Sequence, residues 1–260
     1  MSHVMKEAEP FLFDGSDIAV LVLHGFTGTT QSVRYFGQEL HRRYGFTVRG
    51  PRLAGHGTTP DDMAKTGFLD WVSSCEEALQ ELTAGGRSVF IAGLSMGGTL
   101  ALNLAARFST IVDGIIPINS PVGIFEPPLA ELLVSKSAPA RIPGIGSDIK
   151  DPTASELAYS ELPVSCAREV FILLAATSAF LCKVTCPVLV MHSREDHVVP
   201  PRNGQRILQS VGSDDVRLLW LNDSYHVATL DNDKDLIVQR AGRFIEEIGG
   251  ESIPSTRNQS

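Results

Sequence analysis

The chain has 260 residues, of which 43% are hydrophobic, 20% charged and 7% aromatic, and its formal net charge is −8. This composition is typical of a globular protein and excludes a disordered, collagen-like or coiled-coil chain. The acidic balance argues against a nucleic-acid partner, because such proteins carry a basic domain or stripe. The four cysteines are too few for a disulfide scaffold and lack the spacing of a zinc site, so no metal is expected.

Short apolar runs alternate with helical patterns along most of the chain. Continuous apolar runs predict buried strands at 18–23, 46–49, 88–92, 114–118, 188–191 and 216–221. Helical patterns lie at 33–44, 67–84, 96–108, 202–211 and 234–248. Strands that alternate with helices predict an α/β protein with a mostly parallel central sheet flanked by helices.

One long segment interrupts this alternation. Residues 120–186 show no clear strand, begin rich in Pro and Gly, and end in the apolar stretch 170–182. A connection of this length predicts a functional element such as a lid. The apolar stretch is shorter than the ~20 residues that a membrane-spanning helix needs, so no integral membrane segment is expected. The domain organisation predicted from these patterns is a core at 1–119 and 187–250, a cap at 120–186 and a flexible tail at 251–260.

The first ten residues carry His, Lys and two Glu and have no apolar centre. They therefore do not look like a signal peptide, and a cytoplasmic location is expected. The sequence leaves the oligomeric state open.

The sharpest chemical signal is the pentapeptide 93–97, GLSMG, which fits the G-x-S-x-G pattern. It follows a predicted strand and opens a predicted helix, which is the context of a nucleophile elbow. Such a turn forces Ser95 into a strained backbone conformation, so small residues must flank it, and Gly93, Gly97 and Gly98 supply them. The strain would project the hydroxyl above the sheet, and Ser95 is the predicted nucleophile.

A serine hydroxyl needs a base, and the base needs an orienting carboxylate. His226 follows the predicted strand 216–221, and Asp196 follows the predicted strand 188–191. Loops at the carboxyl ends of parallel strands gather on one edge of a sheet, and the order Ser, Asp, His is the one expected for this type of triad. Glu195 and Asp223 compete for the role of Asp196, whereas Asp231 is expected to support a loop or a helix start.

The oxyanion of such a reaction needs two N–H donors. One is expected from Met96, the residue after the nucleophile, and the other from Phe26 in the loop after the strand 18–23. His24 and His56 lie in neighbouring loops and are expected to brace them, because a second catalytic histidine has no task in this triad.

These motifs together resemble the α/β-hydrolase superfamily. The segments HGFTG, GHG, GLSMGG, SREDHVVP and SYHVATLDNDKD follow its order across residues 18–248, and the resemblance extends to small bacterial carboxylesterases and monoacylglycerol lipases. It implies an α/β-hydrolase fold with a small cap inserted after the sixth family strand. It also implies Ser95 as nucleophile, Asp196 as acid, His226 as base, and Phe26 and Met96 as oxyanion donors. Tyr225 departs from the pattern, since these proteins usually have Gly before the histidine.

The expected function is that of a serine carboxylic-ester hydrolase without cofactor, acting through an acyl-enzyme on a small-molecule acyl ester such as a monoacylglycerol. A serine at the elbow argues against dehalogenases and epoxide hydrolases of this fold, which use Asp there. A thioesterase, amidase, carbon–carbon hydrolase, acyltransferase or non-catalytic small-molecule receptor stays open, because a fold does not fix a substrate. Apolar residues of the segment 120–186 are expected to roof the site and favour short- to medium-chain acyl groups. They are Leu129, Leu132, Leu133, Val134, Phe171, Ile172, Leu173, Leu174, Phe180 and Leu181.

Overall fold

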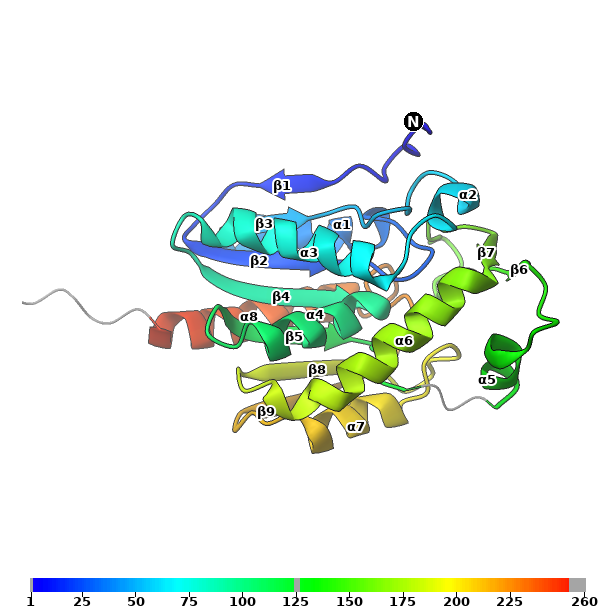
Figure 1. Cartoon of the computed structure of the whole chain (residues 1–260). Helices are drawn as coiled ribbons and strands as arrows, with labels where there is room; N and C mark the ends of the chain where they lie inside the picture. The colour runs from blue at the N-terminus through cyan, green and yellow to red at the C-terminus, as the bar shows by residue number, and fades with distance from the viewer. Residues whose placement is uncertain (1, 124–126, 253–260) are drawn as a thin grey trace, which may run out of the picture.

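Within the described residues, 2–123 and 127–252, the computed structural model contains a seven-stranded sheet in the order β1-β3-β2-β4-β5-β8-β9 (Figure 1). Every neighbouring pair in this sheet is parallel except β1 and β3, which are antiparallel. The strands are β1 Phe11–Phe13, β2 Ile18–Leu23, β3 Thr47–Gly50, β4 Ser88–Leu94, β5 Val112–Ile118, β8 Val188–Ser193 and β9 Val216–Leu221. The mostly parallel α/β architecture predicted from the sequence is therefore confirmed.

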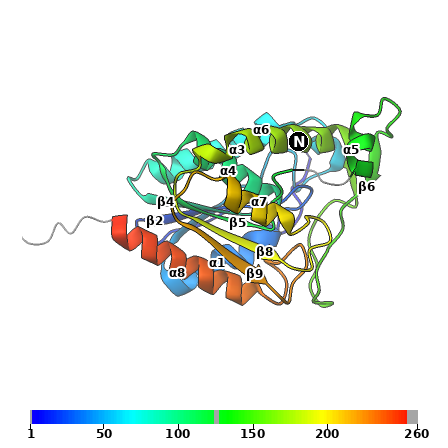
Figure 2. The ribbon, with the colours of Figure 1, turned by 90° about the horizontal axis from the view of Figure 1, so that it is seen from below.

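Helices cover both faces of this sheet. Those of the core are α1 Gln31–Tyr44, α2 Pro60–Met63, α3 Phe68–Thr83, α4 Met96–Arg107, α7 Arg202–Ser210 and α8 Lys234–Ser252. Figure 2 shows α1 and α8 on one face and α3, α4 and α7 on the other. The strands β4 and β5 lie in the middle of the sheet, so they are covered from both sides.

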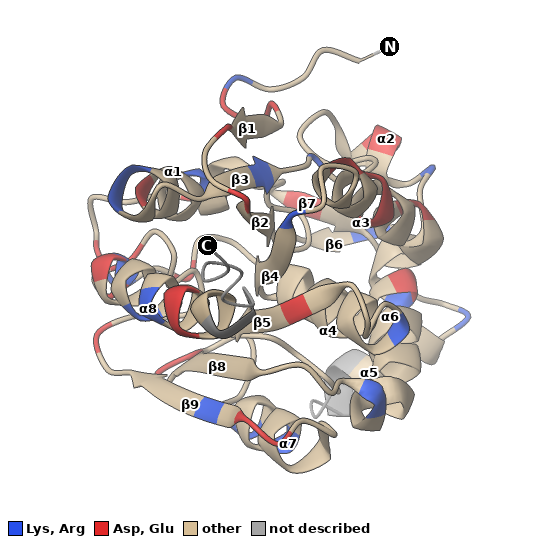
Figure 3. Cartoon of the chain, turned by 90° about the vertical axis from the view of Figure 1, so that its left-hand side faces the viewer, with Lys and Arg blue, Asp and Glu red and all other residues tan. Residues whose placement is uncertain are grey.

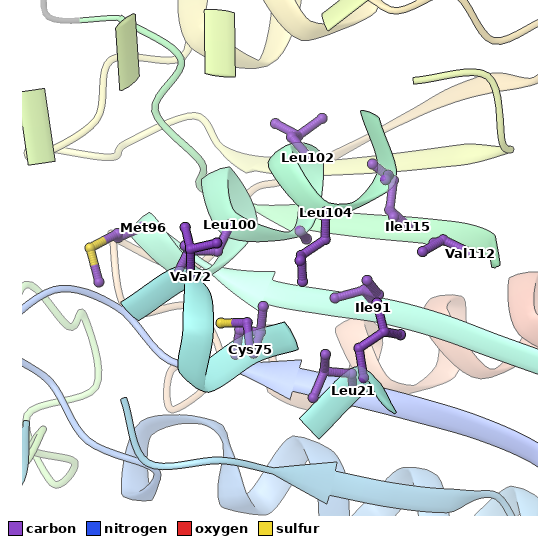
Figure 4. Packing of buried hydrophobic residues seen from close by; sticks show 14 of the residues in the cluster. Leu21, Val72, Cys75, Ile91, Met96, Leu100, Leu102, Leu104, Val112 and Ile115 are labelled. Carbon is purple, nitrogen blue, oxygen red and sulfur yellow. The ribbon is translucent and has the colours of Figure 1, made fainter. Parts of the chain in front are cut away.

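Two hydrophobic clusters, one on each face of the sheet, make up the core. Leu21 and Ile91 belong to the cluster under α3 and α4, and Figure 4 shows them beside Cys75 and Leu104 from these helices. Val20 and its alternate neighbours along β2 belong to the cluster under α1 and α8. Because successive side chains of a strand point to opposite faces, a strand covered on both sides is apolar throughout. This explains why the strands were recognisable as continuous apolar runs.

Charged residues of both signs are interspersed on the surface helices α1 and α8 (Figure 3). Arg43 of α1 forms ion pairs with Glu39 in the same helix and with Asp235 in α8. Pairs of this kind at an exposed surface contribute roughly 0–1 kcal/mol each. Stability therefore depends mainly on the two buried clusters.

The segment between β5 and β8, residues 119–187, contains further short elements. They are α5 Pro127–Val134, β6 Arg141–Pro143, β7 Glu161–Pro163, α6 Val164–Phe180 and the 3₁₀ turn η1 Leu181–Lys183. In Figure 1, α5, β6 and β7 lie beyond the ends of the core strands, and α6 runs obliquely past α4. The expectation that this segment has no strand is wrong, since β6 and β7 pair antiparallel. Each has three residues, which is too few to produce a recognisable alternation.

Helix α6 is longer than the apolar stretch 170–182 suggested. Together with η1 it spans 20 residues, Val164–Lys183, and by length and composition alone it is apolar enough to cross a membrane. In the fold α6 packs against α3 and α4. Of the 18-residue apolar stretch within Val164–Lys183, 33% is buried inside the protein. Leu173 and Thr177 are among its buried residues.

Two features at the chain ends were not described correctly by the sequence patterns. Strand β1 was not predicted, because three residues at a sheet edge carry little periodic signal. The flexible tail was expected to begin at residue 251, but Glu251 and Ser252 still belong to α8. Residues 253–260 lie outside the described residues.

Asp231 connects the loop after β9 to the irregular segment 144–160. Its carboxylate accepts hydrogen bonds from the N–H groups of Lys150 at 2.7 Å, Asp151 at 3.0 Å, Tyr225 at 2.8 Å and Asn232 at 2.8 Å. The residue is fully buried. A buried carboxylate is tolerated because it is fully hydrogen-bonded, and it supports the loop as expected from the sequence.

Replacing Asp231 by Ala should destabilise the protein markedly. The change leaves several backbone N–H groups without an acceptor, and each such loss costs about 1–3 kcal/mol when the group is buried. We expect the free energy of unfolding, measured by urea titration, to fall by about 3 kcal/mol or more. Asp14→Ala, at an exposed carboxylate, is the control and should unfold as the wild type does. Equal unfolding midpoints for Asp231→Ala and the control would contradict this role.

Candidate active site

The turn between β4 and α4 holds Ser95 in a strained conformation, with φ +54° and ψ −123°. Glycines make this turn sterically feasible. A Cβ atom at Gly93 would lie 2.2 Å from the carbonyl of Gly97, and one at Gly97 would lie 2.2 Å from the carbonyl oxygen of Leu23. Both positions therefore exclude any larger residue, which is the physical reason for the G-x-S-x-G pattern.

The side chains of Ser95, His226 and Asp196 form one hydrogen-bonded chain. The Oγ of Ser95 lies 2.9 Å from Nε2 of His226, and Nδ1 of His226 lies 2.9 Å from Oδ2 of Asp196. The carboxylate also accepts the N–H groups of Val198 at 2.9 Å and Val199 at 2.7 Å. These bonds fix Asp196 as an acceptor, so Nδ1 of His226 carries the proton and Nε2 is free to accept the serine hydroxyl.

The electrostatics of the buried pair favour an ionised carboxylate beside the imidazole. Burial alone would lower the pKa of His226, but the Asp196 carboxylate and, less strongly, Glu156 and Asp148 outweigh it and raise this pKa above 6.5. Burial would likewise raise the pKa of Asp196, but the charge and hydrogen bond of His226 keep it below its ordinary value. Each group therefore stabilises the charged form of the other.

The other carboxylates considered for the acid lie elsewhere. Glu195 and Asp223 are exposed, and both form ion pairs with Lys150, at 3.3 and 3.2 Å. Asp231 binds backbone N–H groups, as described above. The structure thus brings Asp196, and neither Glu195 nor Asp223, to the imidazole of His226.

Asn119 is a buried residue of the site that the sequence patterns did not single out. It lies directly after β5, and its φ of +46° is rare for a residue other than glycine. Its side-chain amide donates to the carbonyl of His226 at 2.7 Å and to Oγ of Ser193 at 3.0 Å, and its Oδ1 accepts the N–H of Ser193 at 2.7 Å. It therefore connects the ends of β5 and β8 to the loop of His226. Its position at the carboxyl end of a central strand is the signal that could have identified it.

His24 orients the loop that contains Phe26. The N–H of Leu53 donates to Nε2 of His24 at 3.2 Å, so the ring proton is on Nδ1, which donates to the carbonyl of Gly25 at 2.9 Å. In a trans peptide the N–H points opposite to the carbonyl, so this bond also fixes the direction of the Phe26 N–H. Burial lowers the pKa of His24 to about 4, which keeps the ring neutral. The bracing role predicted for His24 fits these contacts.

His56 lies beside His24 and is also buried. Its ring packs edge-on against His24 at 5.2 Å and Trp71 at 5.7 Å between centroids, and Nδ1 bonds the carbonyl of Ala54 at 3.0 Å. Burial lowers the pKa of His56 to about 3. A neutral ring between aromatic neighbours fits the expected structural role.

An apolar cavity of about 240 Å³ opens next to Ser95. Its walls combine Phe26 and Met96 of the core with residues from the segment 120–186. Those from the segment are Pro121, Gly123, Leu133, Ile142, Pro143, Ile145, Leu162, Ala167, Val170 and Leu174. The cavity is thus closed on one side by this segment.

The apolar residues expected to roof the site divide among several environments. Leu133 and Leu174 line the cavity. Leu173 and Leu181 instead pack into the core cluster. The remainder are exposed or half-buried: Leu132, Val134, Phe171, Ile172 and Phe180. The side chain of Leu129 lies outside the described residues. Fewer of these residues face the cavity than the sequence suggested, because α6 also has to pack on the core.

A second, smaller recess also reaches Ser95 and His226. It is lined by Thr27, Ile145 and Glu156 among others. Glu156 is a half-buried carboxyl group that loses part of its hydration, and this raises its pKa to about 7 although the positive charge of His226 opposes the shift. Perturbed carboxyl groups beside a nucleophile are functional candidates. Glu156 lies in a segment without any motif, so no sequence signal pointed to it.

The cysteines do not take part in this site. All four are free thiols, and Cys75, Cys166 and Cys186 are buried. Burial raises the pKa of Cys186 to about 12, so its reactive thiolate is scarce at neutral pH. Within residues 2–123 and 127–252, no group of three or more His, Cys, Asp or Glu side chains is arranged to hold a metal ion.

A serine on a strained strand-to-helix turn, hydrogen-bonded to a histidine from the loop after the last strand of a mostly parallel sheet, is the architecture of the α/β-hydrolases. Comparison with known proteins identifies the family within this superfamily. Residues 16–233 match the sequence profile of the Hydrolase_4 family, described as serine aminopeptidase, S33. The chain belongs to this family of α/β-hydrolases.

Curated relatives cover nearly the whole chain. A thermostable monoacylglycerol lipase from Bacillus sp. (strain H-257) is 42% identical, over 95% of this chain and 98% of the lipase. A carboxylesterase from Bacillus subtilis (strain 168) is 31% identical, over 92% of this chain and 97% of the esterase. A solved structure from work on the metagenome-derived lipolytic enzymes LipS and LipT aligns with a TM-score of 0.92 and 46% identity, over 94% of this chain and 100% of that one. The protein is accordingly an ester hydrolase, as the sequence motifs predicted.

The raised pKa of His226 can be measured directly. We expect the imidazole of His226 to titrate above 6.5 by NMR of labelled histidine, with the resonance assigned through His226→Gln. In Asp196→Asn the pKa of His226 should fall, because burial then acts on the cation without the neighbouring carboxylate. Glu195→Gln removes the adjacent exposed carboxylate and serves as the control, with a much smaller change. A wild-type value below 6.5, or equal shifts in both variants, would contradict this account.

Proposed function

We propose that the protein hydrolyses monoacylglycerols, with Ser95 as nucleophile, His226 as general base and Asp196 as the acid that orients it. The observation that carries this proposal is the 2.9 Å contact between Oγ of Ser95 and Nε2 of His226 at the mouth of an apolar cavity. The relative named as a monoacylglycerol lipase, 42% identical over 95% of this chain, supports the substrate class.

The reaction proceeds through an acyl-enzyme. His226 takes the proton of Ser95 as Oγ attacks the ester carbonyl, and the negative charge develops on the former carbonyl oxygen. When the tetrahedral intermediate collapses, the bond to the alcohol breaks and His226 gives the proton to the leaving alkoxide. A water molecule, deprotonated by His226, then attacks the acyl group, and the proton returns to Ser95 as the fatty acid leaves.

The developing oxyanion is stabilised by the N–H groups of Phe26 and Met96. Met96 begins α4, and the first N–H groups of a helix have no acceptor within the helix. The direction of the Phe26 N–H is fixed through the bond of His24 to the Gly25 carbonyl. Removing one such donor in a well-studied protease lowers kcat by about 10²–10³.

The surroundings of Ser95 suit the two parts of a monoacylglycerol, because an apolar cavity lies beside a polar carboxyl group. The apolar cavity takes the acyl chain, since each buried methylene contributes ~0.8 kcal/mol, nearly fourfold in binding. The smaller recess, of about 10 Å³, has room for one small group, and Glu156 in its wall can accept a hydrogen bond from a hydroxyl group beside the ester. An apolar group on one side of the ester and hydroxyl groups on the other describe an amphiphilic substrate.

Residues 120–186 act in this proposal as a cap over the site, and residues 1–119 and 187–250 act as the catalytic core. The walls that this segment contributes to the cavity support the assignment. A cytoplasmic location completes the proposal, and four free thiols fit a reducing compartment.

Replacing Ser95 by Ala should abolish hydrolysis of 1-monoacylglycerols and p-nitrophenyl esters. Loss of the serine from a triad lowers kcat by ~10⁶ in a well-studied protease. A p-nitrophenyl phosphonate should label the wild type at Ser95 alone, as mass spectrometry can show. Labelling at another serine, or faster turnover of matched thioesters or anilides than of esters, would overturn the proposal. Tight binding of a small molecule without turnover would indicate a receptor instead.

The size of the cavity should limit the acyl chain. We expect kcat/KM to rise from acetyl to medium-chain esters and then to fall toward palmitoyl, because methylenes beyond the cavity gain no further burial. Ala167→Leu, in the cavity wall, should reduce kcat/KM for octanoyl esters far more than for acetyl esters. Ala175→Leu lies in the same helix but lines a neighbouring groove, so it is the matched control. A flat profile, or a steady rise to the longest chains with good hydrolysis of triolein, would refute the expectation.

A further inference from the structure

We propose that Asp148 is a positioning residue that holds the loops of Asp196 and His226 together from within the segment 120–186. The inference rests on the proposed function of Ser95 and His226 and adds a part of the chain that the triad does not include. Asp148 belongs to the irregular segment 144–160.

The carboxylate of Asp148 bonds both catalytic loops at once. Its Oδ2 accepts the backbone N–H of His226 at 3.1 Å and that of His197 at 3.3 Å. Its Oδ1 accepts Nδ1–H of His197 at 2.8 Å. His197 directly follows Asp196 in the chain, so one carboxylate holds the residue after the acid and the base itself. Hydrogen bonds to an ionised acceptor are about twice as strong as neutral ones.

The backbone of the same residue adds a further bond to the loop of the base. The carbonyl of Asp148 accepts the N–H of Val227 at 3.0 Å. Asp148 therefore binds the N–H groups of two successive residues, His226 and Val227. Two residues further on, Lys150 forms ion pairs with Glu195 and Asp223, one from each catalytic loop. The contact between this segment and the two loops is therefore made at several points, and Asp148 is the residue that bonds both loops through its side chain.

Tyr225 extends this contact, and it is the position at which the chain departs from the family pattern. Its ring packs edge-on against the ring of His197 at 4.5 Å between centroids, and the ammonium of Lys150 lies 5.6 Å above it. Glycine at this position could make neither contact. The side chain thus fills the space between the segment and the two loops.

The physical consequence concerns the distance between Ser95 and His226. A displacement of about 1 Å in a reacting group can cost ~10²-fold in rate. The loop of His226 is held from one side by the amide of Asn119 and from the other by Asp148. Asp231 and the backbone carbonyl of Asp148 still bind Tyr225 and Val227 of this loop. Removing the Asp148 carboxylate therefore loosens the loop at His226 itself, while the serine stays fixed in its turn.

Charge is a second, separable contribution of Asp148. The titratable groups that face the imidazole of His226 are Asp196 and His192 from β8 and its loop, and Glu156 and Asp148 from the segment 144–160. The negative charge of Asp148 is one of those that raise the pKa of His226. Its loss should therefore move the acidic limb of the pH–rate profile to lower pH.

Two substitutions separate these contributions. Asp148→Ala removes the acceptor, so kcat for p-nitrophenyl butyrate should fall at least about tenfold, with KM changed less than about twofold. Asp148→Asn keeps an oxygen that can accept both backbone N–H groups, so it should retain most of kcat while its acidic limb moves to lower pH. Asp151→Asn, in the same segment, removes a carboxylate charge, keeps the oxygen that accepts from Thr153, and should behave as the wild type. Titration with a p-nitrophenyl phosphonate gives the concentration of active sites, so that loss of folded protein is not read as loss of kcat.

The outcomes distinguish this inference from the proposed function. Wild-type kcat per active site in Asp148→Ala, or a change confined to KM, would overturn the positioning role. An acidic limb of the pH–rate profile at the same pH in Asp148→Asn as in the wild type would overturn the contribution of the Asp148 charge. Full activity in Ser95→Ala would instead overturn the triad itself, whatever the Asp148 variants do.

Discussion

The tight turn at Ser95 is the constraint on which the rest of the site depends. A backbone with φ +54° costs a serine about 1–3 kcal/mol, and it persists because neighbouring groups hold it. The N–H of Ser95 donates to the carbonyl of Ile118 at 2.8 Å, and its own carbonyl accepts the N–H of Gly98 at 2.9 Å. The turn is thereby connected to β5 on one side and α4 on the other. With the serine fixed in this way, the imidazole has to be brought to it.

The strain is not confined to one residue. Among the described residues, four other than glycine have a positive φ, and they are Glu7, Thr27, Ser95 and Asn119. Thr27 lines the smaller recess, and Asn119 binds the carbonyl of His226. Three of the four strained positions therefore lie at one edge of the sheet. Strain of this kind is typical of sites in which geometry is set before the substrate arrives.

The predictable part of the protein is the part with repeated or sterically forced patterns. Buried strands are apolar on both faces, so their runs were visible, and the glycines around Ser95 are forced by contacts near 2.2 Å. The chain order of Ser95, Asp196 and His226 follows from the topology of the sheet, and the structure brings these three residues into contact. The choice between Asp196 and its neighbour Glu195 needed the three-dimensional contacts, because both residues follow the same strand.

The unpredictable part lies mainly in the segment 144–160. Asp148 and Glu156 act through single carboxylates on an irregular backbone, and such contacts have no period and no fixed spacing. Strands β6 and β7 are too short to show alternation, and α6 alternates between burial on α4 and exposure. The apolar pattern therefore predicted a shorter helix than α6, and it predicted more side chains in the cavity wall than α6 places there.

The same irregular segment contacts both the smaller recess at Ser95 and His226, the proposed catalytic base. Ile145 and Glu156 line the recess at Ser95, and Asp148, between them in the chain, binds the N–H of His226. In the proposed mechanism, a substrate that contacts Ile145 or Glu156 would thus touch the segment that supports the base. Binding energy from the alcohol part of the substrate can then be used to align His226, which raises kcat rather than only lowering KM. On this argument the proposed cap would affect kcat, through the support of His226, as well as the binding of the acyl chain.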